Sequence, residues 1–141
     1  MTFSIQRRVE FRDTDAAGIV HFSAFFPMME AAEHEMLRAL GMSVLPIGGQ
    51  GDLPAVTWPR VSASCDYVSA ARFEDILTIS VQVARMGSSS VEYRFRFSRE
   101  DQLIAQGSMT AVCCQLISES HVRLAKTSIP DVIRQLLAKH Q

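Results

Sequence analysis

The sequence predicts an α+β fold in which one long helix packs against an antiparallel sheet. Three observations support this prediction. Apolar residues recur at helical spacing over residues 24–40, several later segments alternate apolar with polar residues, and turn-forming residues separate these segments by short connections. A chain of 141 residues is long enough to bury a substantial core but too short for two ordinary domains. We therefore expect residues 1–141 to form a single domain.

The first expected element is a strand that leads into two acidic residues. Its alternation runs as far as Arg12, and Asp13 and Asp15 follow it. After Gly18 the spacing of apolar residues becomes helical, so both acids are expected in a short loop between a strand and a helix. One face of the predicted strand carries Ile5, Val9 and Phe11, and the other carries Gln6, Arg8, Glu10 and Arg12.

The helix expected from about Ala24 to Leu40 is unusually apolar. Pro27 fits only in its first turn, and Gly41 is a suitable residue to end it. A helix with one apolar stripe is expected to pack against a sheet. The stripe comprises Phe25, Met29, Ala32, Met36 and Leu40, whereas Glu30, Glu33 and Arg38 lie off it.

After this helix the patterns are mainly those of strands. Residues 46–54 are rich in Gly and Pro and are expected to form a loop. Pro59 requires an edge position or a bulge in the strand that contains it. Strands are expected over residues 56–69, 77–83, 91–97 and 103–117, and a short amphipathic helix over residues 131–139.

The segment 103–117 differs from the other strands because both of its alternating sets are small or apolar. We expect it to be a central strand that is covered on both faces. One helix covers only one face of a sheet, so the second cover is expected to be another subunit. The sequence therefore predicts a homo-oligomer, either a dimer or a homotetramer.

Composition argues against several functional classes. Fourteen basic and fifteen acidic residues give a formal charge of −1, and the basic residues are scattered, which argues against a nucleic-acid partner. The N-terminal residues lack the apolar run of a signal peptide, and no window holds the ~18 apolar residues of a membrane span. We expect no membrane partner and a cytoplasmic location. The histidines and cysteines lack the spacing of a metal site, so neither a metal nor a cofactor is expected.

The loop around Asp15 is the candidate active site. A carboxylate near the positive end of a helix dipole is favoured in its ionised form, which suits a nucleophile or a general base. Backbone N–H groups at the helix start have no helical partner and can hold a substrate oxygen. The structural alternative for Asp15 is an Asx turn or a helix cap, and the expected role of Asp13 is a loop-stabilising hydrogen bond. A calcium loop is excluded because Ala17 and Ala24 stand where oxygen ligands are required.

The motif Phe-x-Asp-x-Asp-x-x-Gly-Ile-Val at residues 11–20, followed by an aromatic-rich helix start, resembles the hotdog-fold acyl-CoA thioesterases of the 4-hydroxybenzoyl-CoA thioesterase family. Residues 73–79 resemble the start of that family's second long strand, and Arg123-Leu124 with Ile129-Pro130 resemble its closing segment. The resemblance implies the hotdog fold, an antiparallel sheet wrapped around one long helix. It also implies hydrolysis of an acyl-CoA or aroyl-CoA thioester to free acid and thiol.

The resemblance also implies roles for particular residues. It assigns Asp15 as the catalytic nucleophile or general base, and the backbone N–H of Phe22 as the donor that polarises the thioester carbonyl. The turn that follows the second long strand lacks the basic residues with which some relatives bind coenzyme A. Substrate contacts are expected from Gly18, which has no Cβ and permits close approach, from His21, Phe25 and Met29, and from Ser89 and Ser90 in that turn.

Two other functions remain open at this point. His21 acting with an acid would suit a dehydratase or hydratase of acyl thioesters, and its structural alternative is a helix cap. A non-catalytic acyl-thioester-binding protein would keep the fold and the pocket without turnover. Release of free thiol separates a hydrolase from both, and loss or gain of a conjugated double bond identifies the dehydratase.

Overall fold

The computed structural model of the protein describes residues 2–44, 53–116 and 123–141. Most of the loop expected over residues 46–54 therefore lies outside the described residues. In chain order the elements are β1 (Phe3–Arg8), the 3₁₀ turns η1 (Phe11–Asp13) and η2 (Phe22–Ala24), α1 (Phe25–Ala39), β2 (Arg60–Tyr67), β3 (Ile76–Met86), β4 (Ser90–Arg99), β5 (Gln102–Val112), β6 (Cys114–Leu116), β7 (Leu124–Lys126) and α2 (Asp131–Ala138).

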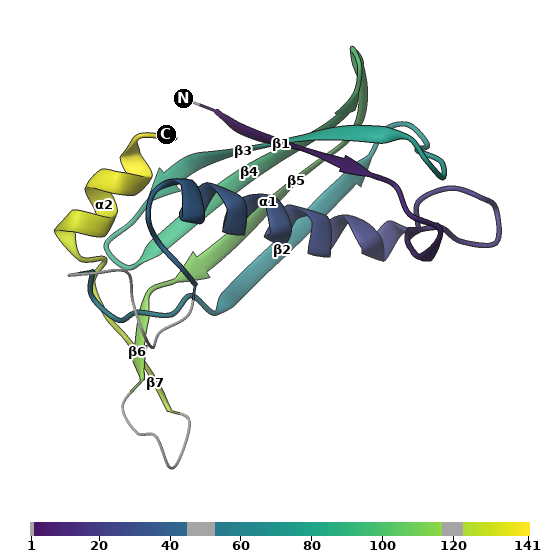
Figure 1. Cartoon of the computed structure of the whole chain (residues 1–141). Helices are drawn as coiled ribbons and strands as arrows, with labels where there is room; N and C mark the ends of the chain where they lie inside the picture. Colours follow the sequence, from purple (N-terminus) through teal and green to yellow (C-terminus); the bar gives the residue numbers. More distant parts are fainter. Residues whose placement is uncertain (1, 45–52, 117–122) are drawn as a thin grey trace.

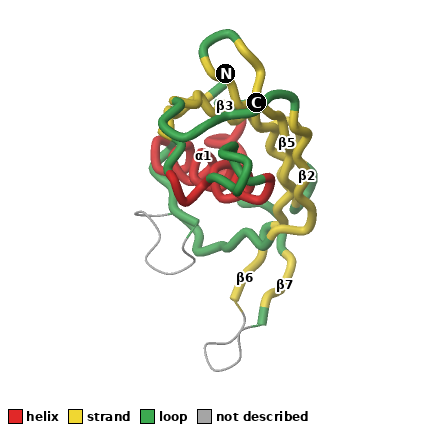
Figure 2. The backbone as a smooth tube through the Cα atoms, turned by 90° about the vertical axis from the view of Figure 1, so that its right-hand side faces the viewer, coloured by secondary structure: helices red, strands yellow, loops and turns green. Residues whose placement is uncertain are grey.

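Among the described residues, five strands form one antiparallel sheet in the order β1-β3-β4-β5-β2 (Figure 1). The sheet curves around α1, and the view turned by 90° shows its strands above the helix and along its right-hand side (Figure 2). The short β6–β7 pair forms a separate hairpin, and α2 packs near β3. This arrangement confirms the predicted α+β fold with a sheet wrapped around one long helix.

Helix α1 begins and ends close to the predicted residues. Gly41 has φ +78°, and the N–H groups of Gly41 and Met42 donate to the carbonyls of Arg38 and Leu37 at 2.9 and 2.8 Å. These two bonds form a Schellman motif, in which a glycine with positive φ ends the helix. The buried face comprises Phe25, Met28, Met29, Ala32, Glu33, Met36 and Leu37. The prediction was wrong for Glu33, which lies on the buried face.

The first strand is shorter than predicted, because it ends at Arg8 and a 3₁₀ turn follows. The side chain of Asp13 accepts the backbone N–H of Glu10 at 2.8 Å, which completes a capping box and holds the turn. Phe11 therefore leaves the strand, and it is 78% exposed instead of lying on the inner face of the sheet. Local hydrogen bonding overrode the alternating pattern here.

The predicted strand 103–117 is also corrected. It ends at Val112, a separate strand β6 starts at Cys114, and the central strand of the sheet is β4. The inner face of β5 packs against α1. The side chain of Met29 lies against Gly107 of β5, where there is no room for a Cβ. The outer face is not apolar along its middle, because Gln106 is exposed and Ser108 is only half-buried. The described residues therefore leave the middle of this outer face open to solvent.

Strand β2 is an edge of the sheet and has a register shift between Arg60 and Ser62. An edge position or a bulge was expected from Pro59, and β2 has both. The strand starts only after this proline. Its outer edge has no strand beside it among the described residues.

Candidate active site

Asp15 stands at the base of a tight turn that returns the chain toward α1. Its N–H donates to the carbonyl of Ile19 at 2.9 Å, and the N–H of Gly18 donates to the carbonyl of Asp15 at 3.0 Å. Gly18 has φ +80°, a conformation that favours glycine and closes the turn. One carboxylate oxygen of Asp15 accepts the N–H of Ala17 at 2.8 Å. The Asx turn, which was the structural alternative for Asp15, is therefore present, and no described residue donates to the other carboxylate oxygen.

The start of the helical segment lies at Phe22, seven residues after Asp15, so the acid itself is not a helix cap. His21 is the N-cap of η2, and its Nδ1 accepts the N–H of Ser23 at 3.2 Å and lies 2.7 Å from the Ser23 hydroxyl. The residue before Phe22 is held to the acidic loop, since the N–H of His21 donates to the carbonyl of Asp13 at 2.8 Å. Within the described part of the chain, no group accepts the N–H of Phe22. This donor is available for a ligand.

Asp13 has the loop-stabilising hydrogen bond that was expected. Asp13 is buried, with 7% exposure. In addition to the N–H of Glu10, its carboxylate accepts a hydrogen bond from the guanidinium of Arg7 at 3.2 Å. Its two oxygens hold the end of β1 to the acidic loop. Asp13 therefore stabilises the loop that carries Asp15, and both of its carboxylate oxygens already have hydrogen-bond partners.

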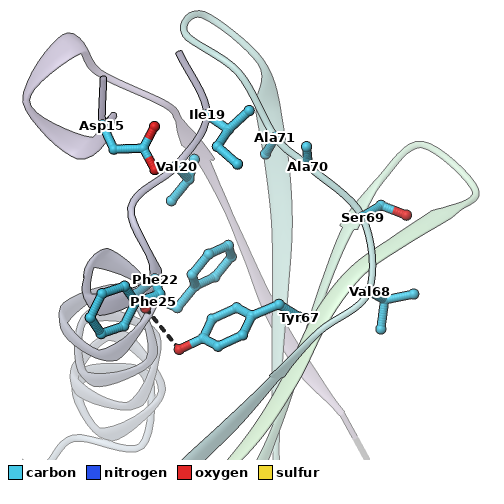
Figure 3. Close-up of a pocket in the computed structure, with 10 residues that line it drawn as sticks. All are labelled: Asp15, Ile19, Val20, Phe22, Phe25, Tyr67, Val68, Ser69, Ala70 and Ala71. Atoms are coloured by element: carbon cyan, nitrogen blue, oxygen red, sulfur yellow. Dashed lines mark hydrogen bonds between the residues drawn. The ribbon is translucent and has the colours of Figure 1, made fainter. Parts of the chain in front are cut away.

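A cavity of about 330 Å³ opens between the Asp15 turn, the start of α1 and the connection that follows β2 (Figure 3). Figure 3 shows Asp15 at one end, Tyr67 at the other, and Phe22 and Phe25 on the helix side. The volume falls at the lower end of the range for small-molecule sites, roughly 300–1,000 Å³. The lining residues are Asp15, Ile19, Val20, Phe22, Phe25, Tyr67, Val68, Ser69, Ala70 and Ala71.

The structure brings together Asp15, Phe22 and Phe25 of the residues predicted for the site. Gly18 shapes the turn, and His21 caps η2, but neither lines the cavity. Met29 is fully buried in the core against Gly107.

Ser89 and Ser90 lie at the other end of the sheet from the cavity. Ser89 lies in the turn between β3 and β4 and Ser90 is the first residue of β4, whereas the cavity adjoins the end of β2 and the connection that follows it. Within one chain, the structure does not bring these serines to Asp15. Each remains a predicted contact for a longer ligand.

Sequence reasoning missed two residues. Tyr67 lines the cavity, and its hydroxyl donates to the carbonyl of Phe22 at 2.9 Å. Desolvation raises the pKa of Tyr67 above 10.0, with a further rise from nearby Cys65, so the hydroxyl keeps its proton at neutral pH. Arg134 of α2 donates to the carbonyls of Gly87 and Ser88 at 2.8 and 3.2 Å. It brings a cation to a turn whose own sequence has none.

In residues 2–44, 53–116 and 123–141, no group of three or more His, Cys, Asp or Glu residues is placed to hold a metal ion. No helix in the same ranges is long and apolar enough to cross a membrane.

The fold and this cavity define a class of protein. A sheet curved around one long helix, with an acidic turn beside the helix start, is the hotdog fold of thioester hydrolases. The family model of the thioesterase superfamily matches residues 17–106, more than half of the chain. The chain belongs to the thioesterase superfamily, as the motif at residues 11–20 indicated.

Proteins that match this chain over almost its whole length support this assignment. The chain is 30% identical over 137 residues to a 1,4-dihydroxy-2-naphthoyl-CoA hydrolase of Nostoc punctiforme, covering 97% of this chain and 87% of the relative. It is 33% identical over 136 residues to a protein of the same name from a Synechococcus species, covering 94% and 87%. The chain is therefore a thioester hydrolase.

Solved structures give the same result for the fold. A 1,4-dihydroxy-2-naphthoyl-CoA thioesterase from Synechocystis superposes with a TM-score of 0.82 and 26% identity, covering 98% of this chain and 96% of that one. A 4-hydroxybenzoyl-CoA thioesterase in complex with 4-hydroxybenzoyl-CoA superposes with a TM-score of 0.81 and 24% identity, covering 96% and 98%. The second likeness confirms the fold predicted from the sequence motif.

Proposed function

We propose that this protein hydrolyses an aroyl or acyl thioester of coenzyme A, with Asp15 as the nucleophile or general base and the Phe22 N–H as the oxyanion donor. One observation carries the proposal. Asp15 and Phe22, on two separate turns, line the same cavity, and the first has a carboxylate oxygen and the second an N–H that no described residue engages. This pair supplies both groups that thioester cleavage needs.

The reaction follows from the chemistry of these two groups. In one route the Asp15 carboxylate attacks the thioester carbonyl carbon, the C–S bond breaks, and water then hydrolyses the mixed anhydride. In the other route Asp15 takes a proton from a water that attacks the carbon directly. In both routes, thioester and water give free acid and thiol, and the Phe22 N–H stabilises the oxyanion. Because a thiolate leaves readily, one carboxylate and one donor suffice.

The wall of the cavity supports an aromatic or other flat acyl group. Phe22, Phe25 and Tyr67 all contribute rings to it, and Phe25 packs edge-on against Phe97 with ring centroids 5.1 Å apart. Rings of this kind favour offset or edge-to-face contact with an aromatic substrate. The names of the relatives, hydrolases of 1,4-dihydroxy-2-naphthoyl-CoA, support an aroyl-CoA as the first substrate to test.

A second copy of the chain completes the site in this proposal. The support is the outer edge of β2, where Val61 is 62% exposed and Tyr67 48% exposed. Unpaired strand edges with apolar side chains favour pairing with another chain. Pairing along β2 places a second subunit beside the cavity, and its turn containing Ser89, Ser90 and the docked Arg134 is our candidate for the contact with the coenzyme A arm. The assembly is a homodimer or a homotetramer that functions in the cytoplasm.

A thiol-release assay tests the proposal. The purified protein is mixed with aromatic, short-chain and long-chain acyl-CoAs, and free thiol is measured with a disulfide reagent. We expect thiol release with an aroyl-CoA, and a fall in kcat of about a hundredfold or more for Asp15→Asn, because an amide is neither base nor nucleophile. Substrate binding without thiol release would identify a binding protein, and a change in conjugation without thiol release would identify a dehydratase. Near-normal turnover by folded Asp15→Asn would exclude the proposed mechanism.

A further inference from the structure

Tyr67 links two parts of the site that are 45 residues apart in the sequence. It is the last residue of β2, and its side chain reaches from this edge strand to the turn that precedes α1, where its hydroxyl donates to the carbonyl of Phe22 (Figure 3). Phe22 carries the proposed oxyanion donor on its N–H. Its other backbone polar group is the one that Tyr67 holds.

The tyrosine ring is itself held in place. The end of β2 is fixed because the N–H groups of Val68 and Ser69 both donate to the carbonyl of Ile104, at 2.8 and 3.0 Å. The ring packs against Phe25 with centroids 5.4 Å apart, and Phe25 is 3% exposed in the core. Although Tyr67 is 48% exposed, these contacts hold its ring where the hydroxyl meets the carbonyl of Phe22.

Phe22, in contrast, is weakly held by its own side chain. Phe22 is 62% exposed, and among the described rings it stacks on that of His21, with centroids 4.4 Å apart. Aromatic contacts at the surface bury little area and restrain the backbone poorly. Restraint of this residue must come from its backbone, and its carbonyl has a side-chain partner in Tyr67.

We infer that Tyr67 is a positioning residue whose hydroxyl orients the Phe22 backbone so that its N–H meets the oxyanion of the thioester reaction. The inference rests on the proposed function of Phe22. Its physical basis is the steep geometric demand on such a donor, which must lie about 2.7–3.1 Å from the oxyanion. A displacement of about 1 Å in a catalytic group is known to cost up to a hundredfold in rate. Loss of the restraint therefore lowers kcat more than it weakens binding.

The first test is Tyr67→Phe, which removes the hydroxyl and keeps the ring against Phe25. We expect kcat on the best aroyl-CoA to fall by about tenfold, with KM changed by less than about twofold, as for an interaction made mainly in the transition state. Tyr93→Phe is the matched control, because Tyr93 is the other tyrosine of the chain, is 2% exposed, and does not line the cavity. Its kcat is expected to stay at the wild-type value.

The second test measures the donor directly. An aroyl-CoA labelled with ¹³C at the thioester carbonyl is bound to Asp15→Asn, and the carbonyl stretch is recorded by infrared difference spectroscopy. A well-placed N–H polarises the carbonyl and lowers its frequency. We expect a smaller shift for Asp15→Asn/Tyr67→Phe than for Asp15→Asn alone. Replacing Tyr67 by 4-aminophenylalanine, which retains a donor at the same place, should restore both the shift and most of kcat.

The outcomes separate the inference from the proposed function. An active wild type, an inactive Asp15→Asn, and unchanged kcat and carbonyl shift without the Tyr67 hydroxyl would overturn only the role of Tyr67. A rise in KM alone would also overturn it, because Tyr67 would then be a binding residue. Wild-type protein that cleaves no thioester would overturn the proposed function. If Tyr67→Phe is poorly folded in circular dichroism, 4-fluorophenylalanine at position 67, which keeps the ring but has no donor, replaces it in both measurements.

Discussion

Arg60 at the start of β2 donates two hydrogen bonds to the carboxylate of Glu33 on α1, and the Nη2–Oε1 distance is 2.8 Å. Glu33 is only 1% exposed. The same guanidinium reaches Glu30 at 3.1 Å. Contact with these two carboxylates raises the pKa of Arg60 despite the opposing effect of burial, which is the largest single influence on it. The ion pair fastens the edge strand of the sheet to the helix that carries part of the site.

Arg60→Met is expected to destabilise the protein, because the buried carboxylate of Glu33 loses both of its hydrogen bonds to the guanidinium and keeps only the more distant His34, whose Nε2 lies 3.8 Å from Oε1. Breaking a buried pair in this way costs about 3–5 kcal/mol, and we expect the lower end because Arg60 is 24% exposed. Arg38→Met is the control, since its pair with Glu35 is more than half exposed on both sides and contributes about 0–1 kcal/mol. Urea unfolding of both variants provides the measurement. Equal losses of unfolding free energy would contradict the structural role of the Glu33 pair.

Asp13→Asn is expected to affect stability more than catalysis. The amide keeps an oxygen for the N–H of Glu10 but loses the charge that faces Arg7, so we expect a loss of about 1 kcal/mol. Unfolding in urea and thiol-release kinetics are measured on the same samples. A larger fall in kcat than that of Asp15→Asn would reverse the assignment of the two acids.

Asp75 gives a pH dependence of stability. Its carboxylate accepts the N–H of Arg72 at 2.8 Å and the guanidinium of Arg99 at 2.6 Å, and these contacts hold its pKa below the ordinary value of 3.8. Because folding lowers this pKa, the stabilisation is fully present above the unfolded pKa and is lost as the pH falls through the folded pKa.

The expected difference in unfolding free energy between wild type and Asp75→Asn is about 2 kcal/mol above pH 5. The difference should shrink as the pH falls below 4, because the carboxylate of the unfolded chain is protonated first and that of the folded chain follows at a lower pH. Urea unfolding from pH 3 to pH 7 measures it, and Asp101→Asn on the exposed β4–β5 turn controls for the change in net charge. A difference that persists undiminished at pH 3 would refute this role for Asp75.

Val61→Lys tests pairing along β2. A charge on the outer edge of the strand disfavours pairing with a second chain, so we expect the oligomer to dissociate and kcat/KM to fall with it. Sedimentation velocity at micromolar concentration measures the oligomeric state. Val132→Lys on α2 is the control, since Val132 is also exposed, at 44%, and lies away from this edge. A compact wild-type monomer with full activity would contradict the proposed assembly.

The sequence alone determined the features that repeat along the chain or that form locally. Helical spacing located α1, Gly41 marked its end, and alternation located β3 and β4. The acidic motif located the turn of Asp15 because its spacing is a local property. These predictions succeeded because neighbouring residues were sufficient to decide them.

Only the tertiary structure decided which distant groups meet. Glu33 lies inside because Arg60, 27 residues later, compensates its charge, and nothing near Glu33 in the sequence reveals that partner. Phe11 left its strand because Asp13 bonded back to Glu10, and a local turn then replaced the alternating pattern. Tyr67 reached Phe22 because the sheet curves around α1 and brings the end of β2 beside the turn that precedes the helix. Periodicity reports which residues share a face, whereas the partner that a face meets depends on how the chain closes in three dimensions.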